Sequence, residues 1–130
     1  MARTPATVPA ILVVDDDRRL ADMLAKILAA EGHRVDTADN GRAALSQLAR
    51  RDYDVIITDV RMPELDGFGL YREVERRWPA LLPRVIFITG DSTNPDTQRF
   101  LARIGAPALH KPFDLDDIHR TVREALARRR

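Results

Sequence analysis

The sequence contains no cysteine, which excludes a disulfide framework and any metal site built from thiolates. No apolar run among its 130 residues approaches the length of a membrane span, and the amino-terminal region lacks the long apolar segment of a signal peptide. An excess of one charge is also missing, because 21 basic and 20 acidic side chains leave a formal net charge of +1. That balance does not indicate a nucleic-acid-binding surface. We therefore expect a soluble, cytoplasmic protein that binds neither membrane nor nucleic acid directly.

Lysine is scarce as well: Lys26 and Lys111 are lysine, and every other basic residue is arginine. In such a chain a lysine can mark a place that needs a compact ammonium group rather than a planar guanidinium. Hydrophobic residues make up 45% of the chain, and its length suits one packed domain. We expect residues 1–8 to form a flexible lead-in and residues 9–128 to form that domain.

Apolar runs alternate with amphipathic segments, and this alternation predicts an α/β fold. The first, third and fourth runs are almost continuously apolar, which is typical of a parallel sheet covered on both faces. We expect strands near residues 9–14, 33–38, 54–59, 83–88 and 107–110. The first and last helices should bury stripes made of Leu20, Met23, Leu24, Ile27 and Leu28, and of Leu115, Ile118, Val122 and Leu126.

Acidic residues follow two of these strands. Asp15 and Asp16 come directly after the first run, and Asp59 ends the third. Parallel strands bring their carboxyl ends to one edge of a sheet, so neighbouring strands would place these three acids in one crevice. Clustered carboxylates repel one another unless a cation neutralises them, and ligands that are all oxygen favour Mg²⁺. Asp17 fits a helix cap better than a metal ligand.

Thr89 and Lys111 follow the fourth and fifth strands at the same predicted edge. A phosphoryl group on Asp59 would need a metal ion, a hydroxyl donor and a cation, because phosphoryl transfer mainly requires positioning and charge neutralisation. Taken singly, each of these residues also fits an ordinary turn, loop or cap position. Taken together, they favour the hypothesis that Asp59 is a nucleophile that accepts a phosphoryl group.

At this point the chain resembles a known family, the CheY-like receiver domain of two-component response regulators. The resemblance covers about residues 9–128 and rests on four motifs. They are residues 11–16, residues 57–63 together with Asp66-Gly67, residues 88–90, and Gly105-Ala106 followed by residues 111–113. It implies a flavodoxin-like (βα)5 three-layer sandwich with a parallel sheet of strand order 2-1-3-4-5. The amino-acid sequences of residues 89–91 and 110–113 are similar to those found in receivers attached to hybrid sensor kinases.

The resemblance also implies a role for each candidate residue. Asp59 would be the phosphoacceptor, Asp16 would bind Mg²⁺ directly, and Asp15 would do so directly or through water. The backbone carbonyl of Arg61 would be a further metal ligand. Thr89 would donate to the phosphoryl group, and Lys111, before a cis peptide bond, would pair with it.

In the family, the phosphoryl group comes from a phosphohistidine on a sensor histidine kinase or a phosphotransfer domain. The receiver catalyses only its own phosphorylation and dephosphorylation, so we do not expect a conventional enzyme. Phosphorylation would reshape the surface of the fourth helix, fifth strand and fifth helix, which would contact a downstream protein or form a homodimer. The sequence departs from the family at Ala108, where an aromatic residue is usual, and Arg61 and Asp91 lie where the family tunes phosphate lifetime.

Two alternatives remain at this point. The first is a phosphatase with an aspartyl nucleophile, similar to haloacid-dehalogenase-like enzymes. Those enzymes need a second acid two residues after the nucleophile, and here that position is Arg61. The second is a receiver-like interaction module that never takes phosphate, which is suggested by Ala108.

Overall fold

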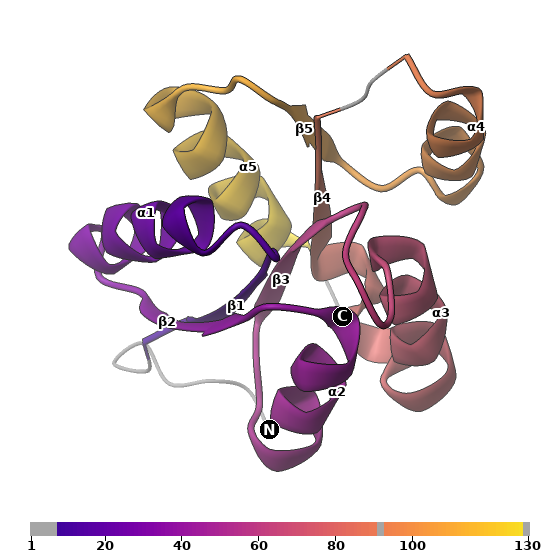
Figure 1. Cartoon of the computed structure of the whole chain (residues 1–130). Helices are drawn as coiled ribbons and strands as arrows, with labels where there is room; N and C mark the ends of the chain where they lie inside the picture. The colour runs from indigo at the N-terminus through magenta and orange to yellow at the C-terminus, as the bar shows by residue number, and fades with distance from the viewer. Residues whose placement is uncertain (1–7, 91–92, 129–130) are drawn as a thin grey trace.

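The computed structural model describes residues 8–90 and 93–128, and its centre is one sheet of five parallel strands (Figure 1). The strands are β1 (Ala10–Val14), β2 (Arg34–Ala38), β3 (Val55–Asp59), β4 (Val85–Thr89) and β5 (Ala108–His110). Their hydrogen-bonded order is β2-β1-β3-β4-β5. The predicted flavodoxin-like architecture is therefore confirmed. Residues 1–7 of the predicted lead-in and Asp91 lie outside the described residues.

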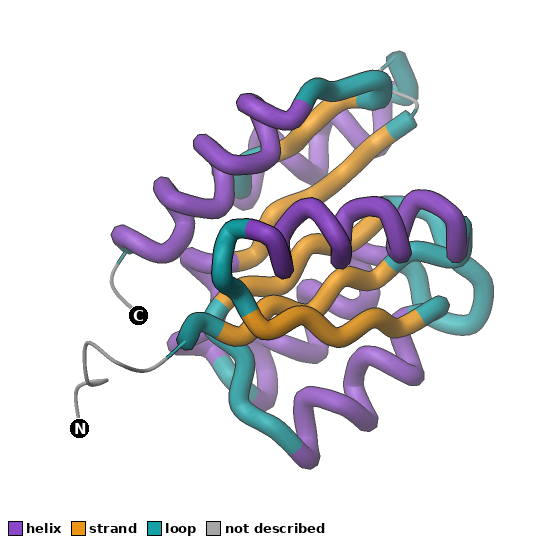
Figure 2. The backbone as a smooth tube through the Cα atoms, turned by 90° about the vertical axis from the view of Figure 1, so that its left-hand side faces the viewer, coloured by secondary structure: helices purple, strands orange, loops and turns teal. Residues whose placement is uncertain are grey.

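Helices cover both faces of the sheet, and the strands form the single layer between them (Figure 2). The helices are α1 (Arg18–Ala30), α2 (Gly41–Arg50), α3 (Gly67–Arg77), α4 (Pro95–Ile104) and α5 (Leu115–Ala127). Side chains of β1 alternate between two cores: Ile11 and Val13 pack with α1 and α5, whereas Leu12 and Val14 pack with α2, α3 and α4. This double burial explains why the strands read as continuous apolar runs. Among the described helices, none is both long and apolar enough to cross a membrane.

Each of these helices begins at a side chain that accepts backbone N–H groups. The caps are Asp17, Asn40, Asp66, Asn94 and Asp114. These side chains satisfy donors that have no partner within the first helical turn. Because every helix starts just after a strand-end loop, the caps fix where the loops at the carboxyl edge of the sheet must turn.

Three local predictions were wrong. Met23 is 46% exposed because α1 buries Ala21, Leu24 and Leu28, a stripe that turns Met23 to solvent. Leu115 is 53% exposed because it is the first residue of α5, and the buried positions of that helix begin at Ile118. The fourth strand begins at Val85 because the preceding residues form a 3-10 helix, η1 (Pro79–Arg84).

A buried ion pair links several elements at the edge of the sheet opposite to the carboxyl ends of the strands. Asp54 is 1% exposed, and its Oδ2 accepts the backbone N–H of Ala10 at 2.8 Å. Its Oδ1 lies 3.7 Å from Nη1 of Arg84. Arg84 in turn donates to the carbonyls of Leu126 and Arg128, each at 3.1 Å. One carboxylate thus links the start of β1 to the end of α5.

Candidate functional site

Three carboxylates meet at the carboxyl edge of the sheet. β1 and β3 are neighbours in register, with Val14 opposite Thr58, so the residues that follow them lie side by side. One oxygen each of Asp15, Asp16 and Asp59 lies within 4.8 Å of the other two. Asp15 and Asp59 are buried, whereas Asp16 is exposed. The structure therefore gathers the three acids that the sequence analysis selected.

Lys111 brings a positive charge to this cluster from the loop after β5. Its Nζ lies 3.8 Å from Oδ2 of Asp15 and 3.8 Å from Oδ2 of Asp59. Its backbone N–H donates to the carbonyl of Thr89 at 2.9 Å. The Lys111–Pro112 peptide bond is cis, as the resemblance implied. The loops after β1, β3 and β5 therefore converge on one point.

Thr89 is the last residue of β4 and is buried. Ile88 lies opposite Asp59 in the sheet, and the carbonyl of Ile88 accepts the backbone N–H of Val60 at 3.1 Å. Thr89 is thus one residue beyond the position paired with Asp59, on the strand between Asp59 and Lys111. This register brings Thr89 to the same edge of the sheet as the three acids and Lys111.

Each buried carboxylate has one oxygen held by the backbone. Oδ1 of Asp59 accepts the N–H of Val60 at 2.9 Å, and Oδ1 of Asp15 accepts the N–H of Asp17 at 2.9 Å. In both residues the other oxygen, Oδ2, is the one near Lys111. Oδ2 of Asp15 is buried and has no hydrogen-bond partner among the described residues. The Lys111 ammonium, 3.8 Å from this oxygen, pairs with its charge but is too far away to donate a hydrogen bond. A bound cation would satisfy the oxygen, because an unsatisfied charged acceptor is costly.

Burial raises the pKa of the Asp15 carboxyl to about 6, and the charge of Asp59 acts in the same direction. Burial also raises the pKa of Asp59 above its ordinary value, although the Lys111 ammonium and the N–H groups of Val60 and Arg61 oppose that rise. Two neighbouring acids that resist ionisation are typical of a functional site rather than of a stabilising one. Oxygen-only donors, two of them buried, fit Mg²⁺ well.

We predict that replacing Asp15 with asparagine stabilises the metal-free protein near pH 8. The pKa of Asp15 is raised on folding from 3.8 to about 6, so its carboxyl is neutral in both states only well below pH 3.8 and carries a destabilising buried charge above about pH 6. The free energy of unfolding should rise by about 1–2 kcal/mol at pH 8. This is less than the full pKa shift implies, because water reaches the adjoining Asp16 and screens the buried charge. Near pH 4 the difference should shrink to about a few tenths of a kcal/mol, because the carboxyl of the unfolded chain is still partly ionised there. Urea denaturation in EDTA at both pH values checks this, and an equal effect at both would contradict it.

Gly67 allows α3 to begin directly against the site. A Cβ at this position would overlap the carbonyl oxygen of Asp59 and lie 3.0 Å from Cα of Val60. The N–H of Gly67 donates to the carbonyl of Val60 at 2.9 Å. The sequence motif contained this glycine, but its packing against Asp59 could not be derived from the motif alone.

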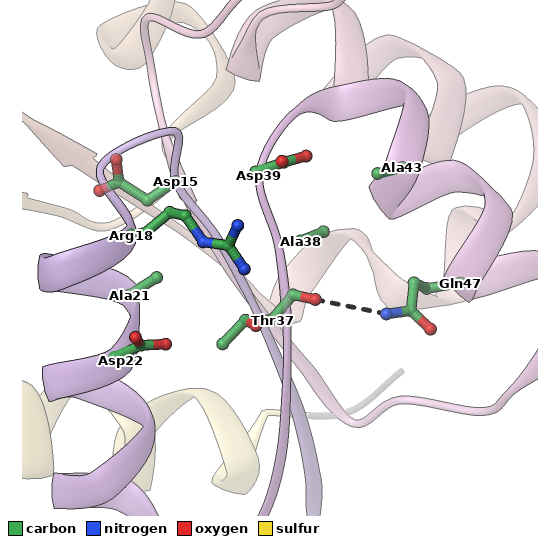
Figure 3. Close-up of a pocket in the computed structure, with 9 residues that line it drawn as sticks. All are labelled: Asp15, Arg18, Ala21, Asp22, Thr37, Ala38, Asp39, Ala43 and Gln47. Carbon is green, nitrogen blue, oxygen red and sulfur yellow. Dashed lines mark hydrogen bonds between the residues drawn. The ribbon is translucent and has the colours of Figure 1, made fainter.

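A pocket of about 230 Å³ adjoins the acid cluster between α1 and α2 (Figure 3). The Arg18 side chain extends into it between Asp15 and Asp39, and Nε2 of Gln47 donates to the carbonyl of Thr37 at 3.3 Å. Only Asp15 belongs to both the pocket and the acid cluster. Sequence reasoning missed this pocket, because its lining residues other than Asp15 belong to none of the motifs.

Ala108 lies opposite Phe87 in the sheet and is half-buried. It packs against the core cluster that contains Phe87 and Phe100. The departure from the family pattern is therefore real in the structure, since β5 offers a methyl group where the family usually has an aromatic ring. The acid cluster and Lys111 are assembled without that ring.

Comparison with known proteins gives consistent results. Residues 11–123 match the family described as the response regulator receiver domain. The chain is 36% identical over 117 residues to the transcriptional regulatory protein ZraR of Escherichia coli O157:H7, covering 90% of this chain and 26% of that protein. It is 35% identical over 119 residues to the transcriptional regulatory protein TcrA of Mycobacterium tuberculosis (strain ATCC 25618 / H37Rv), covering 92% and 46%.

Solved structures agree with this fold. The receiver domain of NtrX from Brucella abortus superposes with a TM-score of 0.80 at 34% identity, covering 89% of this chain and 97% of that one. The chemotaxis response regulator CheY4 of Vibrio cholerae superposes with a TM-score of 0.82 at 30% identity, covering 92% and 100%. The chain spans between about a quarter and a half of the curated relatives ZraR and TcrA. It belongs to the response regulator receiver domain family.

Proposed function

We propose that Asp59 accepts a phosphoryl group and thereby switches a protein-interaction surface. The observation that carries this proposal is the position of Lys111, whose Nζ lies 3.8 Å from Oδ2 of Asp59 beside two further acids. Oδ2 is the oxygen of Asp59 near Lys111, while Oδ1 is held by the N–H of Val60. Oδ2 would attack phosphorus, and the bond from phosphorus to the donor's nitrogen would break as the new O–P bond forms.

The surrounding residues would neutralise and orient the transferred group. The Lys111 ammonium would pair with a phosphoryl oxygen, and the Thr89 hydroxyl would donate to another. Asp15, Asp16, Asp59 and the backbone carbonyl of Arg61 would hold Mg²⁺. When bound, Mg²⁺ would supply charge neutralisation at the phosphoryl oxygens and at the acid cluster.

The phosphoryl donor would be a phosphohistidine on a sensor histidine kinase or a phosphotransfer domain. We also propose that residues 9–128 form the receiver unit, that it works in the cytoplasm with that donor, and that its output is a downstream protein. The surface of α4, β5 and α5 would make that contact or a homodimer contact. Family membership and the site geometry support this proposal, and attachment to a hybrid sensor kinase stays a prediction.

The two alternatives are less favoured. A phosphatase of the haloacid-dehalogenase type would need an acid where Arg61 lies, and membership of the receiver family argues against it. An interaction module that never takes phosphate would not need the buried, orphaned Oδ2 of Asp15. Two incubations with Mg²⁺, one with acetyl phosphate and one with a generic phosphate ester, together test all three functions. One phosphoryl group per chain supports our proposal, sustained turnover of a generic phosphate ester supports the phosphatase, and no labelling supports the interaction module.

Mg²⁺ should raise the melting temperature near pH 8, and this effect should disappear as the pH falls through about 6. The reason is that protons compete with the metal for Asp15, whose pKa burial raises to about 6. Differential scanning fluorimetry at constant ionic strength measures the shift. Asp16→Asn should reduce the shift at pH 8, whereas Asp39→Asn, which removes an exposed acid outside the cluster, should not. A magnesium effect that is unchanged between pH 8 and pH 5 would count against this site.

A further inference from the structure

The groove between α3 and α4 combines an aromatic floor with two arginines. It has a volume of about 410 Å³ and is lined by Tyr71, Arg72, Glu75, Phe100, Arg103 and Ile104. A second hollow of about 300 Å³, which Arg128 also lines, shares Tyr71 and Ile104 with it. The groove lies on the α3 side of α4, and the acid cluster and Lys111 do not line it.

The floor of the groove is well packed. The Phe100 ring is 6% exposed and stacks on Phe68, with 3.9 Å between ring centroids and 24° between planes. Phe87 and Tyr71 meet the same ring edge-on, at 6.4 and 5.9 Å between centroids. Tyr71 and Phe100 line the groove, and packing against Phe68 and Phe87 holds these two rings rigid, which lowers the entropy lost when a partner binds.

Two guanidinium groups flank this floor. Cζ of Arg72 lies 5.4 Å and Cζ of Arg103 lies 5.5 Å from the centroid of Phe100. Within residues 8–90 and 93–128, neither guanidinium forms an ion pair with a carboxylate. Glu75 is the one acid among the lining residues. Burial raises the pKa of Tyr71, and the negative charge of Glu75 raises it further.

Other arginines on the same two helices are used differently. Arg76 pairs with Glu73 at 2.7 Å on α3, and Arg99 pairs with Asp96 on α4. Among the described residues, carboxylates therefore pair with these two arginines but not with the two at the groove. Guanidinium groups held against an aromatic ring keep their hydrogen-bond donors available for an external anion.

We propose that this groove binds an acidic segment of a partner protein. Carboxylates of that segment would pair with Arg72 and Arg103, and an apolar side chain of the segment would pack on Tyr71 and Ile104. A peptide fits better than a polyphosphate, because the lining charge is only +1 and the floor is apolar. The groove shares α4 with the proposed output face but extends to α3 instead of β5 and α5, and binding there does not require phosphorylation. Its failure would therefore leave the phosphoacceptor function standing.

The test titrates the unphosphorylated, isotope-labelled chain with a short capped peptide of alternating glutamate and leucine, followed by amide NMR. Amides at Tyr71, Phe100 and Ile104 should shift, and the glutamine counterpart of the peptide should leave them unchanged. The double variant Arg72→Gln/Arg103→Gln should bind about tenfold more weakly or worse. The matched double variant Arg76→Gln/Arg99→Gln changes the same net charge on the same helices and should bind like the unmodified chain.

Three outcomes would overturn the proposal. Peptide-induced shifts that avoid the groove would place binding elsewhere. An equal loss of affinity in both double variants would indicate general attraction to a basic surface. Shifts of the groove amides with protein concentration alone would assign the groove to a second copy of this chain. The amide spectrum of each variant also verifies that its fold is intact, so a loss of binding reports on the groove.

Discussion

Replacing Asp59 with asparagine should abolish phosphorylation by acetyl phosphate, reducing the labelled fraction by at least about a hundredfold. The substitution preserves the size of the side chain and keeps an oxygen for the N–H of Val60, so the fold should persist. It removes the anionic oxygen that lies 3.8 Å from Lys111, and an amide oxygen is a poor nucleophile toward phosphorus. Intact-protein mass spectrometry in Mg²⁺ buffer measures the fraction of chains that carry one phosphoryl group.

Asp39→Asn is the matched control for this experiment. Asp39 is an exposed acid that lines the neighbouring pocket with Asp15 but stands outside the acid cluster (Figure 3). The Asp39→Asn substitution removes one negative charge at the same edge of the sheet as Asp59→Asn does. Labelling should nevertheless stay at the level of the unmodified chain. If Asp59→Asn were labelled as fully as Asp39→Asn, the phosphoryl group would reside on another residue.

Replacing Asp54 with alanine should produce the largest loss of stability, about 3–5 kcal/mol in the free energy of unfolding. The change leaves the N–H of Ala10 without its side-chain acceptor and Arg84, whose side chain is 14% exposed, without its carboxylate. Arg84 also holds the carbonyls that end α5, so loosening it weakens the contact between that helix and the sheet. In a domain of this size the melting temperature should fall by roughly 10–20 °C.

Two further variants separate the causes of that loss. Asp52→Ala removes an exposed acid two residues earlier and should change stability by less than about 0.5 kcal/mol. Asp54→Asn keeps an acceptor for Ala10 but removes the charge facing Arg84, so its stability should be intermediate. Chemical denaturation gives all three values. A loss in Asp54→Ala no larger than that in Asp52→Ala would mean that the buried pair does not anchor α5.

The sequence allowed the site to be predicted because its geometry follows from topology. Once the strands were recognised as parallel, the residues after β1, β3, β4 and β5 had to share one edge. The positions of Asp15, Asp59 and Lys111 followed from that rule and from the family motifs. Strand-end side chains are set by register, and register is strongly constrained when both faces of a sheet are buried.

Features that depend on side-chain packing were not predictable in the same way. The exposure of Met23 and Leu115 depends on how far each helix rotates and extends over the sheet, and periodicity fixes neither. The pairing of Asp54 with Arg84 joins residues whose sequence context shows no pattern. The arginine-flanked Phe100 ring likewise needed the relative placement of α3 and α4.

A crystal structure of the chain with Mg²⁺ and BeF₃⁻ tests the central claim most directly, because BeF₃⁻ stands in for the phosphoryl group on a carboxylate. Our account predicts beryllium bonded to Oδ2 of Asp59 and a metal ion held by Asp15 and Asp16. It also predicts Nζ of Lys111 within hydrogen-bond distance of one fluorine. A structure with BeF₃⁻ on any other residue, or with the Lys111 ammonium directed away from Asp59, would contradict it.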